Sequence, residues 1–438
     1  MQGVRYLVLL VPYLGLAATG DLGSRLGVAL ACFGAALAAM VWARRWQPVP
    51  SARVVILVAT AMRLLLLPIQ PSLSDDIYRY VWDGKVAGAG LNPYELSPDA
   101  PELASLRGDI WLELDHRDVA TVYPPLALTL FSIAARFPWP ILAWKLIVTI
   151  ADLIACYFLC RLAATRKCGR GGAIWYAWNP LAVVETAGMG HVDALGVCFV
   201  LVAVWALAVK RDSTTAALAA AAGILSKLVP LILVPAWMRQ SPRPWVFAGL
   251  VGLTLIFAFG PVATSVGGIP SGYVRFGTSW EFNGPLYEPL WRGLDAIDSR
   301  DFVEDILDRR KERSEEHEYW NRFYPWNHPR MHARLLLAGL LGGLVIAAWR
   351  KPDPVTTGGR VLEATLLCSA TVYPWYLLWL LPFAALEERR AWLVLCCSGI
   401  LAYVPQFTQT PMMPWIFAAL WGPYAAMRLL DMRRAQEE

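Results

Sequence analysis

The amino-acid sequence predicts an all-α, polytopic integral membrane protein. Of its 438 residues, 57% are hydrophobic and only 17% are charged, whereas soluble domains carry about 25% charged residues. Apolar runs also recur along the whole chain, with lengths near the ~20 residues that a helix needs to cross a bilayer. The candidate spans are residues 4–20, 25–43, 52–70, 140–163, 173–188, 191–209, 244–262, 331–349, 391–407 and 413–430.

Lysine and arginine are concentrated in short blocks between these runs, such as Arg44-Arg45, Lys210-Arg211 and Arg389-Arg390. Such blocks mark cytoplasmic loops, so the net charge of +5 gives no indication of nucleic-acid binding. With Met1 inside, the first two spans form a hairpin and the span 52–70 leads out of the cell. We therefore expect a multi-pass protein of the cell membrane with both termini in the cytoplasm.

Three further segments are expected to be interrupted helices. The segment 121–140 contains Pro124-Pro125 and Pro138 and is expected to be re-entrant or interfacial, because a full span there would move the basic loop after residue 163 outside. The other two are pairs of short helices with a polar or aromatic break between them, 215–226 with 227–238 and 360–373 with 375–387. Such breaks are tolerated at membrane depth only where they line a cavity or are buried in protein. The total is about 12 spans when each pair counts once and about 14 when it counts twice.

Two long polar segments divide the chain. The loop 71–120 holds ten acidic residues against four basic ones, which suits an external loop, and the loop 263–330 is expected on the same side. The predicted organisation is an N-terminal transmembrane hairpin (1–51), a core that includes the first external loop (52–262), the second external loop (263–330) and C-terminal transmembrane helices (331–438).

The strongest candidates for chemistry are Asp75 and Asp76, which follow an apolar run in SDDIYRYVWDGKVAGAGLNPY. One of them can act as a general base that activates an acceptor hydroxyl at the membrane surface. The alternative is a solvated helix N-cap, for which aspartate is favoured. A helix here would place Arg79 and Asp83 on the same face as Asp75, either as a catalytic arrangement or as a surface ion pair.

Polar residues within apolar segments form a second group of candidates. His191 and Asp193 lie between two apolar runs, where polar groups are costly and usually functional; the alternative is a structural cluster with Glu185. Lys227 interrupts AAGILSKLVPLILVP and needs an anionic partner, either a protein carboxylate or a substrate phosphate. Arg63 and Lys145 lie near the ends of spans and are interpreted as structural residues that extend toward the interface.

Aromatic clusters beside charged or amide residues in the external segments are suited to sugars, although most of the 21 tryptophans are expected to form interfacial belts. The chain has no GxxxxGK[ST] loop and no CxxC or HExxH signature, and its five histidines are dispersed. No metal ligands are therefore predicted. The substrate-binding candidates are Arg79, Trp82, Asp83, Asn92, Tyr94, Tyr123, His191, Asp193, Lys227, Trp280, Asn283, Trp375 and Tyr376.

In order along the chain, SDDIYRYVWDGKVAGAGLNPY, YPPLAL, WNPLAVVETAGMGHVDAL, SKLVPLILVP and YPWYLLWLLP resemble the motifs of GT-C glycosyltransferases that use polyprenyl-phosphate sugars. The resemblance covers about residues 52 to 387 and favours the bacterial mannosyltransferase-like branch called glycosyltransferase family 87. It implies an inverting enzyme with its active site outside the cytoplasm and Asp75 or Asp76 as the base. It also places His191 and Lys227 near the donor phosphate. Some members of the superfamily use a divalent metal at a spaced pair of acids; here the pair is adjacent, so a metal is not indicated and no other cofactor is expected.

The sequence therefore predicts a hexosyltransferase that transfers a hexose from a polyprenyl phosphate to a hydroxyl of a cell-envelope glycolipid or glycan. Mannose is the hexose that the resemblance favours. The enzyme's partners would be that donor, that acceptor and the lipid bilayer. The main alternative is a transporter or lipid flippase, which would also contain broken helices and intramembrane charge. The large acidic external loop and the lack of an internal repeat favour the enzyme. A catalytically inactive relative that organises envelope assembly is a third interpretation.

Overall fold

The computed structural model describes residues 2–313, 317–408 and 413–437. Within them the regular structure is helical, and the β-type pairing consists of isolated bridges from Phe282 and Asn283 to Thr371. The all-α prediction is confirmed. In the N-terminal half the principal helices are α1 (Gln2–Thr19), α2 (Leu26–Ala43), α3 (Ala52–Leu66), α4 (Asp76–Gly88), α5 (Asp109–Leu112), α6 (Pro125–Ala135), α7 (Pro140–Ala163), α8 (Gly169–Gly172), α11 (Asp193–Trp205) and α12 (Ser213–Ser226).

The C-terminal half continues with long apolar helices that alternate with shorter segments. In order they are α13 (Val234–Gln240), α14 (Pro244–Ser265), α15 (Ser271–Ser279), α16 (Tyr287–Ala296), α17 (Ser299–Glu312), α18 (His317–Asn321), α19 (Pro329–Trp349), α20 (Pro354–Cys368), α21 (Leu381–Glu387), α22 (Arg390–Ser398), α23 (Tyr403–Thr408) and α24 (Pro414–Glu437). Short 3-10 helices, among them η4 (Val229–Leu233) and η6 (Pro374–Trp379), connect several of these helices.

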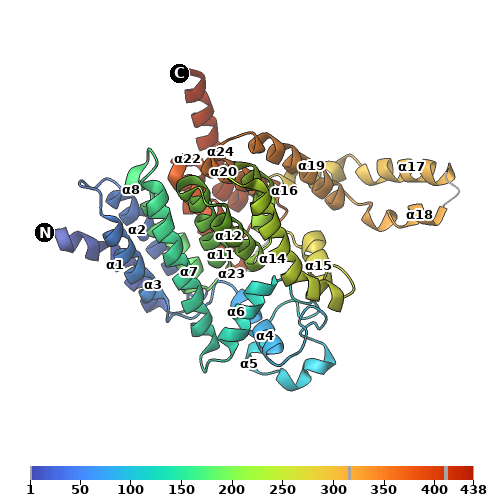
Figure 1. The fold of residues 1–438 in the computed structure, drawn as a ribbon, viewed down its shortest axis with the longest axis horizontal. Helices are drawn as coiled ribbons and strands as arrows, with labels where there is room; N and C mark the ends of the chain where they lie inside the picture. The colour runs from blue at the N-terminus through green and yellow to red at the C-terminus, as the bar shows by residue number, and fades with distance from the viewer. Residues whose placement is uncertain (1, 314–316, 409–412, 438) are drawn as a thin grey trace.

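The long helices form a bundle in which α11 is central. It packs on α7 and α12, and α12 packs in turn on α14 (Figure 1). The loop that carries α4 and α5 lies with α6 at one end of this bundle, while α17 and α18 project sideways as an arm (Figure 1). This arrangement places the acidic first loop over the ends of the helices.

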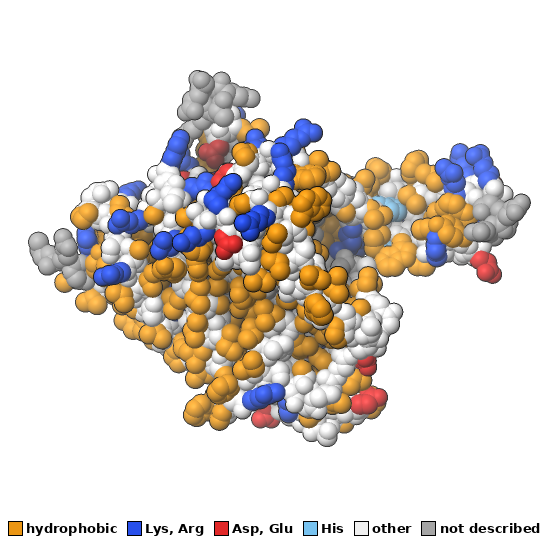
Figure 2. Space-filling model, viewed as in Figure 1, with side chains coloured by type: hydrophobic (Ala, Val, Ile, Leu, Met, Phe, Trp, Pro, Cys, Tyr) orange, Lys and Arg blue, Asp and Glu red, His pale blue; other side chains and the backbone are white. Residues whose placement is uncertain are grey.

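The outer helices expose their apolar side chains. On α14 and α19, for example, Trp245, Phe257 and Leu335 are 81%, 78% and 63% exposed. Exposed apolar surface of this extent is rare on a soluble monomer, and on helices of this length and composition it indicates a surface that faces lipid. Lys and Arg side chains gather along the upper edge of the molecule, above a broad apolar band (Figure 2). Six helices within the described residues are long and apolar enough to span a membrane, so the chain is a polytopic membrane protein.

The interrupted helices occur where the sequence predicts them. The chain is extended at Lys227, between α12 and η4, and again at Tyr373, between α20 and η6. The helix α6 begins at Pro125 and ends before Pro138. Lys227 and Tyr373 are half-buried at their breaks, whereas Phe137 and Trp139, after α6, are exposed.

One predicted span is not a single helix. The segment 173–188 forms α9 (Ile174–Ala177), α10 (Pro180–Val183) and the π-helical turn η2 (Val184–Gly188), all buried within the bundle. The break has a local cause, because Pro180 lacks an N–H and Asn179 caps the new helix by accepting from the Leu181 N–H at 2.9 Å. The segment is therefore a core element.

Candidate active site

A cavity of about 710 Å³ opens between the first loop, the break at Lys227, the second loop and the break at Tyr373. Its wall joins two kinds of surface. Asp75, Asp76 and Asp115 line one part, and Leu228, Val229, Leu362 and Leu366 line another. Ligand cavities of this size with an apolar wall and a few convergent polar groups are typical of small-molecule sites.

Asp75 and Asp76 lie where the chain passes from the end of α3 into α4. Asp75 occupies the N-cap position, but its side chain makes no capping bond; the Ser74 hydroxyl instead accepts from the Asp76 N–H at 3.3 Å. Asp75 therefore occupies the N-cap position without a capping bond from its side chain, and its carboxylate lines the cavity.

The two carboxylates have opposite electrostatic environments. Burial, the Asp76 charge and a hydrogen bond with Asp115 raise the pKa of Asp75 to about 7. Burial would also raise the pKa of Asp76, but the neighbouring His191 imidazole and the Lys227 charge hold it below its usual value. Asp76 is therefore ionised at neutral pH, while Asp75 can gain or lose a proton there.

His191 connects Asp76 to a second, fully buried carboxylate. Its Nδ1 lies 3.7 Å from Asp76 Oδ2 and its Nε2 lies 3.2 Å from Glu185 Oε2. Tyr403 donates its hydroxyl to Glu185 at 3.0 Å. The backbone explains how these groups meet: the π-helical turn η2 carries Glu185, and Gly190, at φ +79°, turns the chain so that His191 points back toward it.

Lys227 has a protein carboxylate as its partner. Its ammonium lies 2.7 Å from both oxygens of Asp193 and 4.5 Å from the centroid of the Tyr376 ring. One part of its side chain still faces the cavity. A lysine held in this way supplies a fixed positive potential at the cavity wall, which the adjacent carboxylate partly neutralises.

A continuous stack of rings runs from His191 to the second loop. His191 stacks on Trp375 at 3.9 Å between ring centroids, Trp375 on Tyr373 at 4.5 Å, and Tyr373 on Phe282 at 4.6 Å. Trp375, Tyr373 and Phe282 line the cavity, and His191 lies behind them. It brings together three segments that are far apart in the sequence.

Comparison with known proteins identifies the family. The family model described as alpha-(1->6)-mannopyranosyltransferase, N-terminal domain, matches residues 6–240, which is more than half of the chain and includes both aspartates, His191 and Lys227. The chain belongs to this mannosyltransferase family. Alpha-(1->6)-mannopyranosyltransferase A of Corynebacterium glutamicum is 22% identical over 381 residues, which cover 78% of this chain and 73% of that relative. No solved structure matches the chain.

The family membership confirms the resemblance to GT-C mannosyltransferases, and it makes this chain a membrane glycosyltransferase. The transporter and flippase interpretation is therefore set aside. Within the described residues, no group of three or more His, Cys, Asp or Glu side chains is arranged to hold a metal ion.

In this glycosyltransferase the predicted site residues divide into three groups. Eight of them line the cavity: Asp75, Asp76, Arg79, Tyr123, Lys227, Trp280, Trp375 and Tyr376. His191 and Asp193 lie behind this wall as the partners of Asp76 and Lys227.

The remaining predicted residues lie away from the cavity wall. Trp82 packs in a small core cluster with Leu103 and Leu114. Asp83 is buried and accepts from Arg79 Nε at 2.8 Å, so this pair is structural rather than exposed. Three others make contacts elsewhere: Asn92 with Ser265, Tyr94 with the Tyr123 carbonyl, and Asn283 with Trp421.

The structure also adds residues that the sequence did not single out. Asp115 and His116 come from the far end of the first loop, and Trp379 donates to Asp193 Oδ1 at 2.5 Å. Nothing local marks Asp115 among the ten acids of its loop. Trp379 lies in the segment YPWYLLWLLP, whose aromatic residues were the available signal.

Arg63 and Lys145 are structural, as expected, but they do not extend to the interface. Arg63 is fully buried, pairs with Asp152 and donates to the Ala177 carbonyl at 2.7 Å. Lys145 donates to the Ile69 carbonyl at 2.7 Å, beyond the end of α3. Both residues tie α3 to the core just before the chain reaches Asp75.

Proposed function

We propose that the protein transfers a mannosyl group from a polyprenyl-phosphate donor to a hydroxyl of an α-(1→6)-linked mannan or glycolipid of the cell envelope, with inversion at the sugar's anomeric carbon. The observation that carries this proposal is the single cavity that contains Asp75, Asp76 and Lys227 next to an apolar wall. The wall suits the lipid chain and the polar part suits the sugar phosphate. The linkage is taken from the names of the family and the relative.

In the proposed reaction Asp75 removes the proton of the acceptor hydroxyl. The acceptor oxygen forms a bond to the anomeric carbon while the bond from that carbon to the phosphate oxygen breaks, and the phosphate leaves with the electron pair. A pKa of about 7 supports Asp75 as the base, because a base is most effective when its pKa is near the working pH. Asp76 stays ionised beside His191 and supports the positive charge that develops on the sugar.

Lys227 lies on the same wall and stabilises the negative charge that develops on the departing phosphate. Because Lys227 is paired with Asp193, it acts on the phosphate as the positive end of a fixed dipole. The second loop, through Trp280, contributes an aromatic surface for the sugars. No metal ion takes part in this scheme.

We further propose that the cavity faces away from the cytoplasm and that both termini are cytoplasmic, with the organisation 1–51, 52–262, 263–330 and 331–438 set out above. The separation of the basic edge from the acidic first loop supports this orientation (Figure 2). The test introduces Asp109→Cys into a chain whose eight native cysteines are replaced by serine or alanine. The new thiol should react with an impermeant maleimide from outside intact cells. Labelling only after lysis would overturn this orientation.

The transfer itself is tested with membrane fractions and radiolabelled polyprenyl-phosphate mannose. We expect transfer by the wild type, a loss of about 10²–10⁴-fold in Asp75→Asn, and a smaller loss in Asp76→Asn. Asp109→Asn is the matched control, because Asp109 is an exposed acid of the same loop outside the cavity. Wild-type transfer that survives Asp75→Asn would overturn the choice of base, and absence of transfer to a supplied α-(1→6)-mannoside would overturn the function.

A further inference from the structure

Two aromatic rings from different external loops meet at the wall of the cavity. His116 from the first loop and Trp280 from the second lie with their ring centroids 4.6 Å apart, and Phe276 lies 5.6 Å from Trp280. His116 is exposed and Trp280 is half-buried. All three line the cavity, so the rings form a surface that a ligand can reach.

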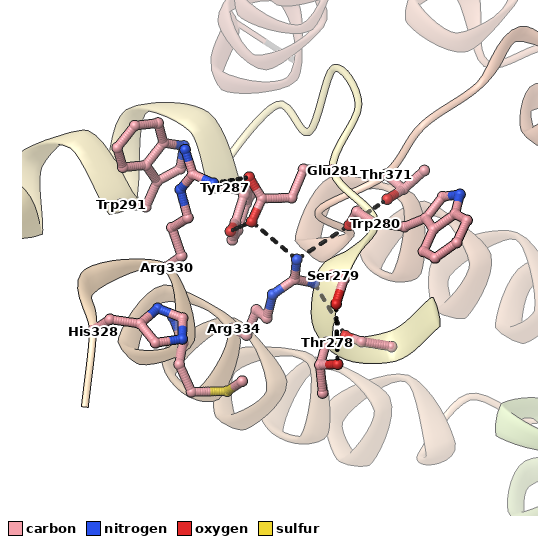
Figure 3. A network of polar contacts seen from close by, with 12 residues as sticks. Thr278, Ser279, Trp280, Glu281, Tyr287, Trp291, His328, Arg330, Arg334 and Thr371 are labelled. Atoms are coloured by element: carbon pink, nitrogen blue, oxygen red, sulfur yellow. Dashed lines mark hydrogen bonds and ion pairs between the residues drawn. The ribbon is translucent and has the colours of Figure 1, made fainter. Parts of the chain in front are cut away.

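The backbone at Trp280 is held by a polar cluster (Figure 3). Arg334 of α19 donates to the carbonyls of Trp280 and Gly277, both at 3.1 Å, and to Glu281 at 3.1 Å. Tyr287 donates its hydroxyl to the same Glu281 carboxylate. We call Arg334, Glu281 and Tyr287 the Arg334 anchor. None of the three lines the cavity, so the anchor acts on the ligand surface only through Trp280.

The backbone at His116 is held in a comparable way. Arg79 donates to the His116 carbonyl at 3.5 Å and to the Val119 carbonyl at 2.6 Å. His116 itself adopts φ +49°, and Asn283, three residues after Trp280, adopts φ +57°. Such conformations cost free energy in residues other than glycine and cluster at ligand-binding segments.

The position of the two rings relative to the acids decides what they can bind. His116 follows Asp115, and both line the same cavity as Asp75. The apolar wall suited to a lipid chain comes from other elements, the break after α12 and α20. A molecule resting on His116 and Trp280 would therefore approach Asp75 from the side of the two external loops, which is the approach required of the acceptor.

We propose that His116 and Trp280 form the subsite for the terminal sugar of the acceptor glycan, and that Arg334 is the positioning residue of that subsite. This inference rests on the proposed function. Aromatic side chains combine a flat apolar face with polar edges, and a hexose that covers such a face can direct a hydroxyl to the neighbouring acids. The acceptor is accordingly a glycan with at least one exposed hexose, rather than a simple alcohol.

The test uses the purified full-length protein with polyprenyl-phosphate mannose as donor and synthetic α-(1→6)-linked mannotetraose as acceptor. Trp280→Ala, His116→Ala and Arg334→Gln are expected to raise the KM for mannotetraose about tenfold, equivalent to about 1.4 kcal/mol, with little change in kcat or in the KM for the donor. Trp280→Phe retains a ring and should recover most of the affinity. A rise in KM alone indicates lost binding rather than lost chemistry.

Arg292→Gln is the matched control, because Arg292 is an exposed arginine of the same loop that pairs with Glu288 and does not contact the Arg334 anchor. It should leave both KM values unchanged. An unchanged acceptor KM in both Trp280→Ala and His116→Ala would overturn the subsite, as would an equal rise in the donor KM. If Trp280→Ala does not fold, His116→Ala and Trp280→Phe still decide the question, since His116 is exposed.

Failure of the subsite and failure of the proposed function give different results. If the wild type transfers no mannose, mannotetraose binding is measured directly by saturation-transfer NMR on the detergent-solubilised protein. Binding that is lost in Trp280→Ala and His116→Ala supports the glycan subsite without the transfer reaction. Binding that is absent in the wild type, or equal in all variants, overturns it.

Discussion

The Lys227 ammonium lies 2.7 Å from each carboxylate oxygen of Asp193, so the most conspicuous charge in the apolar sequence has a partner within the protein. Asp193 is fully buried, and 20% of the Lys227 side chain is exposed. Trp379 donates to the same carboxylate. Asp193 therefore fixes the pair within the bundle, and Lys227 faces the cavity.

This pair gives the first prediction. Asp193→Asn or Lys227→Gln alone should lower the free energy of unfolding by about 3 kcal/mol, because each leaves the other charge without its partner. The double variant should lose less than the sum of the two, since neither charge remains. Thermal unfolding in detergent measures the loss of stability in each of the three variants. If the loss in the double variant equals the sum of the two single losses, the two side chains are not coupled. Transfer activity should stay low in the double variant.

The second prediction concerns pH. A base must be ionised to accept a proton, so with Asp75 at a pKa of about 7, kcat/KM for transfer should be level above pH 7 and fall about tenfold per pH unit below it. Asp115→Asn removes a negative neighbour and a hydrogen bond that raise the Asp75 pKa, so the fall should begin at a lower pH. An acid limb that stays at the same pH in Asp115→Asn would contradict the assignment of that limb to Asp75.

The third prediction concerns His191, whose ring lies between Asp76 and Glu185. In His191→Gln the burial of Asp76 is no longer opposed by an imidazole, so the pKa of Asp76 should rise. Transfer should then fall about tenfold more at pH 6 than at pH 8, relative to the wild type.

The control for this variant is His328→Asn, which retains a side chain able to cap α19 and lies outside the cavity wall. Its pH profile should match that of the wild type. A pH-independent loss in His191→Gln would indicate that the histidine acts only by packing on Trp375.

The fourth prediction concerns the contact of α4 with α6. A Cβ atom at Gly84 would lie 2.3 Å from the Phe131 carbonyl oxygen, which is backbone and cannot move alone. Gly84→Ala should therefore lower the free energy of unfolding by about 1–3 kcal/mol and reduce transfer, because α4 carries Asp76 and Arg79. Gly249→Ala on α14, where no atom lies within 4 Å of the added Cβ, should show neither effect in the same thermal and transfer assays.

Local patterns in the sequence were sufficient for the architecture and for part of the site. The apolar runs gave the long helices, and the polar or proline-containing interruptions gave the breaks at Lys227 and Tyr373. The adjacent acids at the end of an apolar run identified a segment that lines the cavity. These features depend on residues close together in the chain.

The partners of the charged residues depended on tertiary packing. Lys227 pairs with Asp193 rather than waiting for a substrate phosphate, Arg63 is buried against Asp152, and Arg334 bonds to the Trp280 carbonyl. Each of these contacts joins residues that are far apart in the sequence. Hydropathy and periodicity describe which face of a helix is apolar, but they do not determine which faces meet. The sequence alone therefore determined a helical membrane enzyme with two adjacent acids at the end of an apolar run. Only the folded bundle determined which side chains lie next to these acids, because those neighbours come from helices that are distant in the sequence.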